Sequence, residues 1–280
     1  MSKIKIVTDS TADIPKHLAE ELDIEVVPLT VHFGEEAYRD GYDLTPSAFF
    51  EKLKNFPDMP TTSQITPAMF EEAFKDALRD NDTIICITLS SKASGTHQSA
   101  LIAKGMIENG DIEVIDSMAF SYGYGMIVVE AARMVKEGKS KEEIVAQIKD
   151  MLQRLDTYFI VDTLAYLKKG GRINLTAAVV GTILNIKPLL SVQDGLVVPV
   201  DKIRGNKNII PKMVKLIKSK GYDLSERTVG LAHGAMPGRL EELEEAIRKD
   251  FQPKGVTVSE VGSVIGAHAG PGIIGMFILR

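Results

Sequence analysis

Hydrophobic and polar residues alternate in blocks along the first half of the chain. Three times, a run rich in β-branched residues ends in a cluster of aspartate, serine and threonine, and a helical pattern follows; the runs occupy residues 4–7, 83–89 and 112–115. Strands and helices that alternate at this spacing are typical of a parallel sheet covered by helices. The pattern therefore predicts a Rossmann-like α/β fold for this half, with a further strand at residues 24–33.

The first helix is expected to begin at Pro15 and to continue through residues 17–22. Proline suits the first turn of a helix because its missing amide hydrogen has no partner to lose there. Asp13 precedes this turn by two residues, and aspartate is a favoured helix cap. Asp13 is therefore expected to cap the first helix.

The second half mixes strands and helices in a less regular order. A strand, a short helix and a Gly-Gly break are expected over residues 157–173, and amphipathic helices over residues 208–221 and 238–251. The end of the chain, residues 256–280, has the pattern of strands around a glycine-rich turn.

A charged helical pattern at residues 141–155 separates the two halves. Two α/β domains are therefore predicted: an N-terminal domain of residues 1–156 with a parallel sheet, and a C-terminal domain of residues 157–280 with a mixed α/β architecture. The apolar segment at residues 175–192, rich in small side chains, is expected to lie in the core of the second domain.

Charge and composition narrow the class of protein. The 280 residues carry a formal net charge of −5, which argues against a nucleic-acid binder, because such proteins present a basic field. No apolar stretch reaches the length of a membrane span and the N-terminus lacks a signal-peptide pattern, so a cytoplasmic protein is expected. The only cysteine, Cys86, lies in an apolar run and is expected to be buried and inert.

Neither a metal nor a nucleotide cofactor is expected. The five histidines are scattered without the spacing of a metal site. Residues 270–275, GPGIIG, match the dinucleotide pattern G-x-G-x-x-G, but only five residues follow Gly275. That pattern binds a pyrophosphate only where a helix follows it.

The hydroxyl-rich cluster after the second strand is the strongest candidate for function. In a parallel sheet, ligands bind beyond the carboxyl ends of the strands, where helix N-termini present free amides. Ser94 and Gly95 lie at the start of a helical pattern and can bind an anion there, and Thr62 lies in a second hydroxyl-rich loop, PTTSQ. The same residues can equally serve only as helix caps and turn residues.

A serine-dependent hydrolase or transferase is the alternative hypothesis. Ser94 or Ser117 would be the nucleophile, His268 the base and Asp9 the group that orients the base. Neither serine lies in the G-x-S-x-G motif that marks a nucleophile on an α/β sheet. The hydrolase is therefore the second hypothesis, and no catalytic residue is assigned.

Seven motifs, in order and spacing, resemble the DegV family: TDSTADIP, PTTSQ, SSKASGT, VIDS, LAYLKKGGRI, the Lys187-Pro188 pair and IGAHAGPG. They span almost the whole chain. The resemblance implies a two-domain α/β protein that binds one long-chain fatty acid, such as palmitate, in a tunnel between its domains. It also implies a protein that is not itself an enzyme, with a bacterial fatty acid kinase as its possible partner.

The resemblance also assigns roles to individual residues. The carboxylate-binding threonine and serine of the family fall on Thr62 and Ser94, with the Gly95 amide beside them, and His268 matches a histidine near the head group. Arg172 matches a basic position that contacts the kinase. As part of KKGGRI, Arg172 is equally expected to be a solvated residue of an exposed turn.

Overall fold

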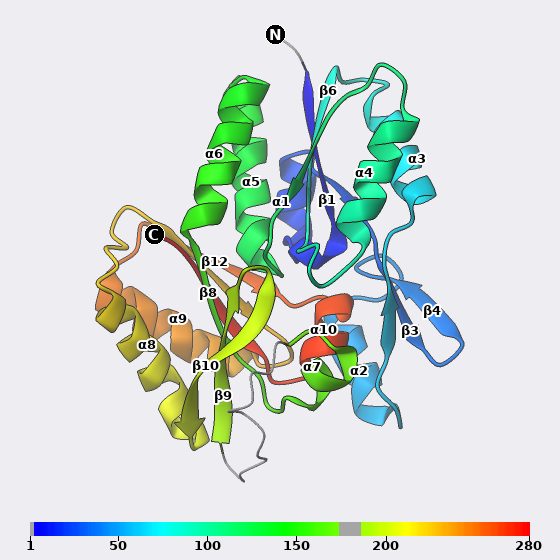
Figure 1. The fold of residues 1–280 in the computed structure, drawn as a ribbon. Coiled ribbons are helices and arrows are strands. Elements are labelled where there is room, and N and C mark those ends of the chain that lie inside the picture. The colour runs from blue at the N-terminus through cyan, green and yellow to red at the C-terminus, as the bar shows by residue number, and fades with distance from the viewer. Residues whose placement is uncertain (1–2, 174–185) are drawn as a thin grey trace.

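In the computed structural model, which describes residues 3–173 and 186–280, the chain forms three sheets with helices packed on them (Figure 1). The first sheet has the strand order β2-β1-β6-β7, and all its neighbours pair in parallel. The parallel sheet predicted for the first half is confirmed. Its strands are β1 (Ile4–Asp9), β2 (Glu25–Val27), β6 (Thr83–Thr88) and β7 (Asp111–Asp116).

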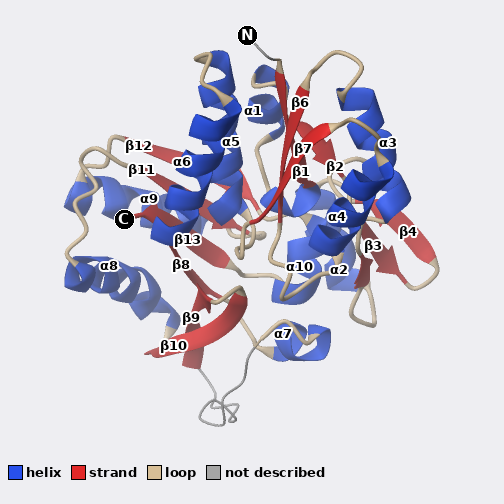
Figure 2. Ribbon diagram, turned by 45° about the horizontal axis from the view of Figure 1, so that its top comes forward, coloured by secondary structure: helices blue, strands red, loops and turns tan. Residues whose placement is uncertain are grey.

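Helices cover both faces of the first sheet (Figure 2). On one face, Phe70 and Phe74 of α3 pack in the same core as Cys86 of β6. On the other, Ile127 of α5 and Ile144 of α6 share a core with the opposite side of the strands. Cys86 is fully buried, as expected, and burial raises the pKa of its thiol. The helices are α1 (Lys16–Glu21), α3 (Pro67–Ala77), α4 (Thr96–Met106), α5 (Tyr122–Lys136) and α6 (Lys141–Arg154).

A small antiparallel sheet carries one of the candidate loops. Its order is β4-β3-β5, and β5 sets Thr62 opposite Val31 of β3. The single strand predicted at residues 24–33 is divided in two, because Pro28, which has no amide hydrogen to donate, lies between β2 and β3. The elements are β3 (Thr30–Phe33), β4 (Glu36–Arg39), β5 (Thr61–Ser63) and the helix α2 (Pro46–Asn55).

The second half forms a six-stranded mixed sheet in the order β10-β9-β8-β13-β11-β12. Leu243 of α9 and Met213 of α8 belong to the core on one face. On the other face, Phe277 packs edge-on against Tyr122 of α5, so this face meets the first half of the chain. The strands are β8 (Leu155–Ile160), β9 (Ile186–Gln193), β10 (Leu196–Arg204), β11 (Thr228–His233), β12 (Gly255–Glu260) and β13 (Ile274–Leu279); the helices are α7 (Ala165–Gly170), α8 (Ile209–Lys220) and α9 (Pro237–Phe251).

The end of the chain contains a helix that the pattern did not predict. Residues expected to be strand-like form α10 (Ser263–Ala269) between β12 and β13. Glycine and valine disfavour helices in isolation, but tertiary packing outweighs this preference. A Cβ atom at Gly266 would lie 2.6 Å from the ring of Phe49, so glycine allows α10 to lie directly on α2. In Figure 1, α10 stands next to α2 and α7.

Asp13 does not cap the first helix, and that prediction is wrong. The N-cap of α1 is Pro15, without a side-chain hydrogen bond. Asp13 follows the 3-10 helix η1 (Ser10–Ala12) with a left-handed φ of 48°, which aspartate tolerates better than most residues. Its carboxylate accepts hydrogen bonds from the Gly262 amide, at 2.9 Å, and from the hydroxyl of Ser121.

Most of the apolar segment predicted at residues 175–192 lies outside the described residues. Its last part belongs to β9, where Leu189 and Leu190 are fully buried. Within residues 3–173 and 186–280, no helix is long and apolar enough to cross a membrane.

Candidate functional site

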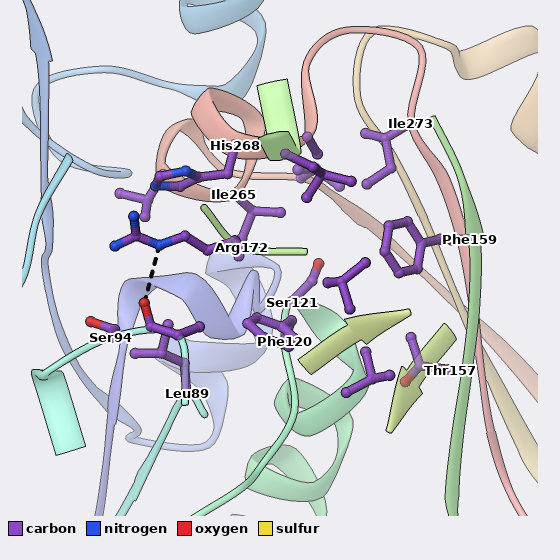
Figure 3. Close-up of a pocket in the computed structure, with 18 of the residues that line it drawn as sticks. Leu89, Ser94, Phe120, Ser121, Thr157, Phe159, Arg172, Ile265, His268 and Ile273 are labelled. Carbon is purple, nitrogen blue, oxygen red and sulfur yellow. Dashed lines mark hydrogen bonds between the residues drawn. The ribbon is translucent and has the colours of Figure 1, made fainter. Parts of the chain in front are cut away.

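A cavity of about 1040 Å³, including its open mouth, lies between the first half of the chain and the six-stranded sheet (Figure 3). Most of the wall is apolar, and it comes from both halves of the chain. Representative wall residues are Leu29, Leu89, Phe120, Phe159, Ile273 and Phe277.

Most polar side chains of the cavity gather near His268, Arg172 and Ser94, on the side opposite Phe159 in Figure 3. Thr62 belongs to the same group, because its Oγ1 lies 2.8 Å from Nε2 of His268, although the two residues are 206 positions apart. The structure therefore brings together in one cavity four residues that were named from the sequence: Thr62, Ser94, Gly95 and His268.

Ser94 and Gly95 stand at the start of α4. Ser94 Oγ lies 3.0 Å from Thr96 Oγ1 and accepts a hydrogen bond from the Thr96 amide at 3.2 Å, which holds the serine against the first turn. Gly95 is the N-cap, and the first amides of a helix have no acceptor within the helix. A Cβ atom at Gly95 would lie 2.2 Å from Oε1 of Gln64, so glycine at this position allows the PTTSQ loop to pack against the start of α4. This arrangement suits an anion.

His268 is neutral at pH 7. Burial, and secondarily the charge of Arg172, lowers the pKa of His268 to about 4. A neutral imidazole can donate to Thr62 or accept from it, depending on its tautomer. Gly170 makes room for this ring, because a Cβ atom there would lie 2.3 Å from Nδ1 of His268. The end of α7 and the end of α10 therefore meet at His268.

Arg172 lines the cavity and is partly buried, so it is not the solvated residue of an exposed turn that was one of the two expectations from the sequence. Its Nε donates to the carbonyl of Ala93 at 3.1 Å, and its guanidinium also donates to the carbonyl of Gly170. In Figure 3, the side chain lies between His268 and Ser94. Among the described residues that line the cavity, Arg172 is the only lysine, arginine or carboxylate, so this end of the cavity carries a positive charge.

The geometry of a serine hydrolase is not formed. Asp9 accepts hydrogen bonds from the hydroxyls of Tyr124 and Thr11 and from the amide of Leu89, rather than from His268. Ser117 donates to a backbone carbonyl two residues further on, and Ser94 bonds to a neighbouring threonine. Across the part of the chain that the structure describes, no group of three or more His, Cys, Asp or Glu side chains could hold a metal ion.

Two contributors to the site were not singled out from the sequence, namely Gln64 and Gly170. Gln64 packs on Gly95 and donates to Ser99 at 3.1 Å, while Gly170 accommodates His268. The only signal for them was their place inside two of the motifs, PTTSQ and LAYLKKGGRI.

Comparison with known proteins covers the chain from end to end. The family model described as "Uncharacterised protein, DegV family" matches residues 3–280. A DegV domain-containing protein from Caldanaerobacter subterraneus is 44% identical over 277 residues, which cover 99% of each chain. A solved DegV family protein from Thermus thermophilus, described by its fatty acid binding, has a TM-score of 0.93 and 33% identity, with both chains fully covered. DegV from Bacillus subtilis, described as a fatty acid binding protein, has a TM-score of 0.91 and 32% identity, again with both chains fully covered. Since both the family model and these relatives span nearly every residue, the chain belongs to the DegV family.

Proposed function

We propose that this protein binds one long-chain fatty acid, with the carboxylate at the polar end of the cavity and the acyl chain along the apolar walls. The observation that carries the proposal is the division of one cavity into a polar end, with Thr62, Ser94, His268 and Arg172, and a mostly apolar remainder. A ligand with one anionic end and a long apolar tail matches this division. The two solved relatives described as fatty acid binding support the same ligand class.

The side chains at the polar end would offset the free energy lost when a carboxylate leaves water. An anion moved from water into an apolar site without partners is strongly disfavoured. Here the hydroxyls of Thr62 and Ser94 and the backbone at Gly95 can donate hydrogen bonds, and Arg172 supplies the opposite charge. A hydrogen bond to a charged group contributes about 1.5–3 kcal/mol.

The apolar walls would supply most of the affinity. An acyl chain of about sixteen carbons gains on the order of ten kcal/mol gross from burial, at about 0.8 kcal/mol per methylene. Ordering of the chain and loss of free motion on association offset much of this gain. In this account the tail supplies most of the binding free energy, and the head-group contacts orient the ligand and add to its affinity.

The finer part of the proposal is that the bound carboxylate is presented to a fatty acid kinase, with this protein as a carrier and not the catalyst. Lys168 and Lys169 are exposed at the end of α7 and lie close in sequence to Arg172. They form a basic surface next to the head-group end that an acidic partner surface would match.

Arg172→Ala tests the contact with a kinase. Formation of acyl phosphate by an added fatty acid kinase should fall even at fatty acid concentrations that saturate the variant. Lys215→Ala, which removes an exposed charge on α8 away from the cavity lining, is the control for charge loss, and both fatty acid affinity and acyl phosphate formation should be unchanged in it. If the fall in Arg172→Ala disappears at saturating fatty acid, Arg172 serves only the cavity and the kinase contact is wrong.

Mass spectrometry of small molecules extracted from the purified protein tests the ligand class. We expect close to one fatty acid per chain, and much less from the Thr62→Ala/Ser94→Ala double variant purified in parallel. Recovery of no lipid, together with no uptake of added palmitate, would overturn the proposal. A covalent serine adduct with a hydrolase probe would instead revive the serine-dependent alternative.

A further inference from the structure

Two buried aspartates from the first half of the chain bind the start of α10, the helix that carries His268 into the cavity. Oδ1 of Asp40 accepts a hydrogen bond from the Ser263 amide at 2.8 Å and another from the Ser263 hydroxyl at 2.5 Å. Asp13 accepts from the Gly262 amide at 2.9 Å. The two aspartates are only 2% and 7% exposed, so water does not compete freely for these bonds.

The other oxygen of each aspartate is anchored in the first half. Oδ2 of Asp40 accepts from Ser10 at 2.8 Å, and the Ser10 hydroxyl in turn accepts from the Leu29 amide at 3.1 Å. The carboxylate of Asp13 accepts from Ser121, whose side chain lines the cavity. Each carboxylate therefore bridges the first half of the chain and the start of α10.

We infer that Asp13 and Asp40 are positioning residues of the lipid site: by fixing the start of α10, they hold His268 against Thr62. This inference rests on the proposed fatty acid function. It gives Asp13, whose predicted capping role is wrong, a structural role elsewhere in the fold.

Because α10 is short, the position of its start also fixes the position of His268. The helix has seven residues, too few to be stable without tertiary contacts. Ser263 and His268 are separated by less than one and a half turns, so a shift at the start of α10 reaches the histidine directly. Val264, Ile265 and Ala269 of the same helix also line the cavity. Release of the start of α10 would therefore disturb the head-group contact and part of the wall together.

Asp40→Ala is the sharper test, because Asp40 has an ordinary backbone conformation whereas alanine at Asp13 would be strained by its φ of 48°. Asp40→Asn keeps an oxygen that can accept from Ser263 and serves as the conservative rescue. Thr8→Val is the matched control for a lost buried hydrogen bond, because Thr8 donates to the Ile87 carbonyl within the first sheet, at 2.8 Å, away from α10.

Two measurements separate positioning from a general loss of stability. Palmitate affinity, measured by titration calorimetry on delipidated protein, should fall about threefold to tenfold in Asp40→Ala, the size expected for loss of one hydrogen bond near the ligand. The pKa of His268, followed by NMR of its ring proton, should rise from about 4 toward 6.5 in Asp40→Ala as the ring becomes hydrated. In Asp40→Asn and Thr8→Val, the palmitate affinity and the pKa of His268 should both stay close to the wild-type values.

A double-variant cycle shows whether Asp40 acts through His268. In a His268→Ala background, Asp40→Ala should weaken palmitate binding clearly less than it does when His268 is present, because the positioned group is already gone and only the effect on the wall remains. Equal losses with and without His268, or an unchanged His268 pKa in Asp40→Ala, would overturn the inference. If Asp40→Ala does not fold, Ser263→Ala removes one of the same bonds and must show the same pattern on a smaller scale. Failure of wild type to bind palmitate would instead reject the proposed function.

Discussion

Acidification below pH 7 should destabilise the protein through His268, and the size of the effect follows from burial of the ring. The ordinary pKa of 6.5 applies in the unfolded chain, whereas the fold lowers it to about 4. Because the folded pKa is depressed, the unfolded state takes up the proton first, and stability is lost as the pH falls from 6.5 toward 4. The full difference corresponds to about 3 kcal/mol of unfolding free energy. Between pH 7 and pH 5, the same linkage gives a loss of about 2 kcal/mol.

His268→Gln isolates this effect, because glutamine keeps a polar group near Thr62 but does not titrate. Urea unfolding of delipidated protein at pH 7 and pH 5 should show wild type losing about 2 kcal/mol more than the variant. Burial raises the pKa values of Asp9, Asp13 and Asp40, so protonation of these aspartates stabilises the folded state as the pH falls. This effect opposes that of His268. Because wild type and the variant both contain the three aspartates, their contribution cancels in the comparison. Equal losses in the two proteins would refute the argument that His268 is buried and neutral.

Three further predictions concern single side chains. Gly170→Ala should weaken palmitate binding by displacing the ring of His268, whereas Gly238→Ala, where a Cβ atom meets nothing within 4 Å, should leave the affinity unchanged; calorimetric titration of both variants checks this. Gly95→Ala should also lower palmitate affinity in the same titration, because the new Cβ atom would displace a neighbouring glutamine at the start of α4. The buried thiol of Cys86 should resist alkylation in the folded protein and react fully in urea, as intact mass would show, and rapid alkylation of folded protein would contradict its burial.

The parts of the fold that depend on local pattern were predictable from the sequence. The parallel sheet of the first half follows from β-branched runs that end in capping residues. The helix α10 was missed because Gly266 fits against Phe49, a contact made only after folding. The role of Asp13 was missed for the same reason, since its partner Gly262 is 249 residues away.

The candidate site shows the same division between local and tertiary information. Thr62, Ser94 and His268 were named through motif resemblance, and the structure brings them together. The position of Arg172 was not predictable from KKGGRI, because two glycines flanked by charged residues are typical of an exposed turn. Its contact with the carbonyl of Ala93 joins residues 79 positions apart.

Titration of palmitate into wild type and into the Ser94→Ala, Thr62→Ala and Thr62→Ser variants tests the head-group assignment most directly. Each alanine variant removes one charge-assisted hydrogen bond, so affinity should fall by about one to two orders of magnitude. The double alanine variant should deviate from additivity because both hydroxyls serve one ligand, and Thr62→Ser, which keeps the hydroxyl, should be much milder. Palmitate binding with wild-type affinity in both alanine variants would contradict the account.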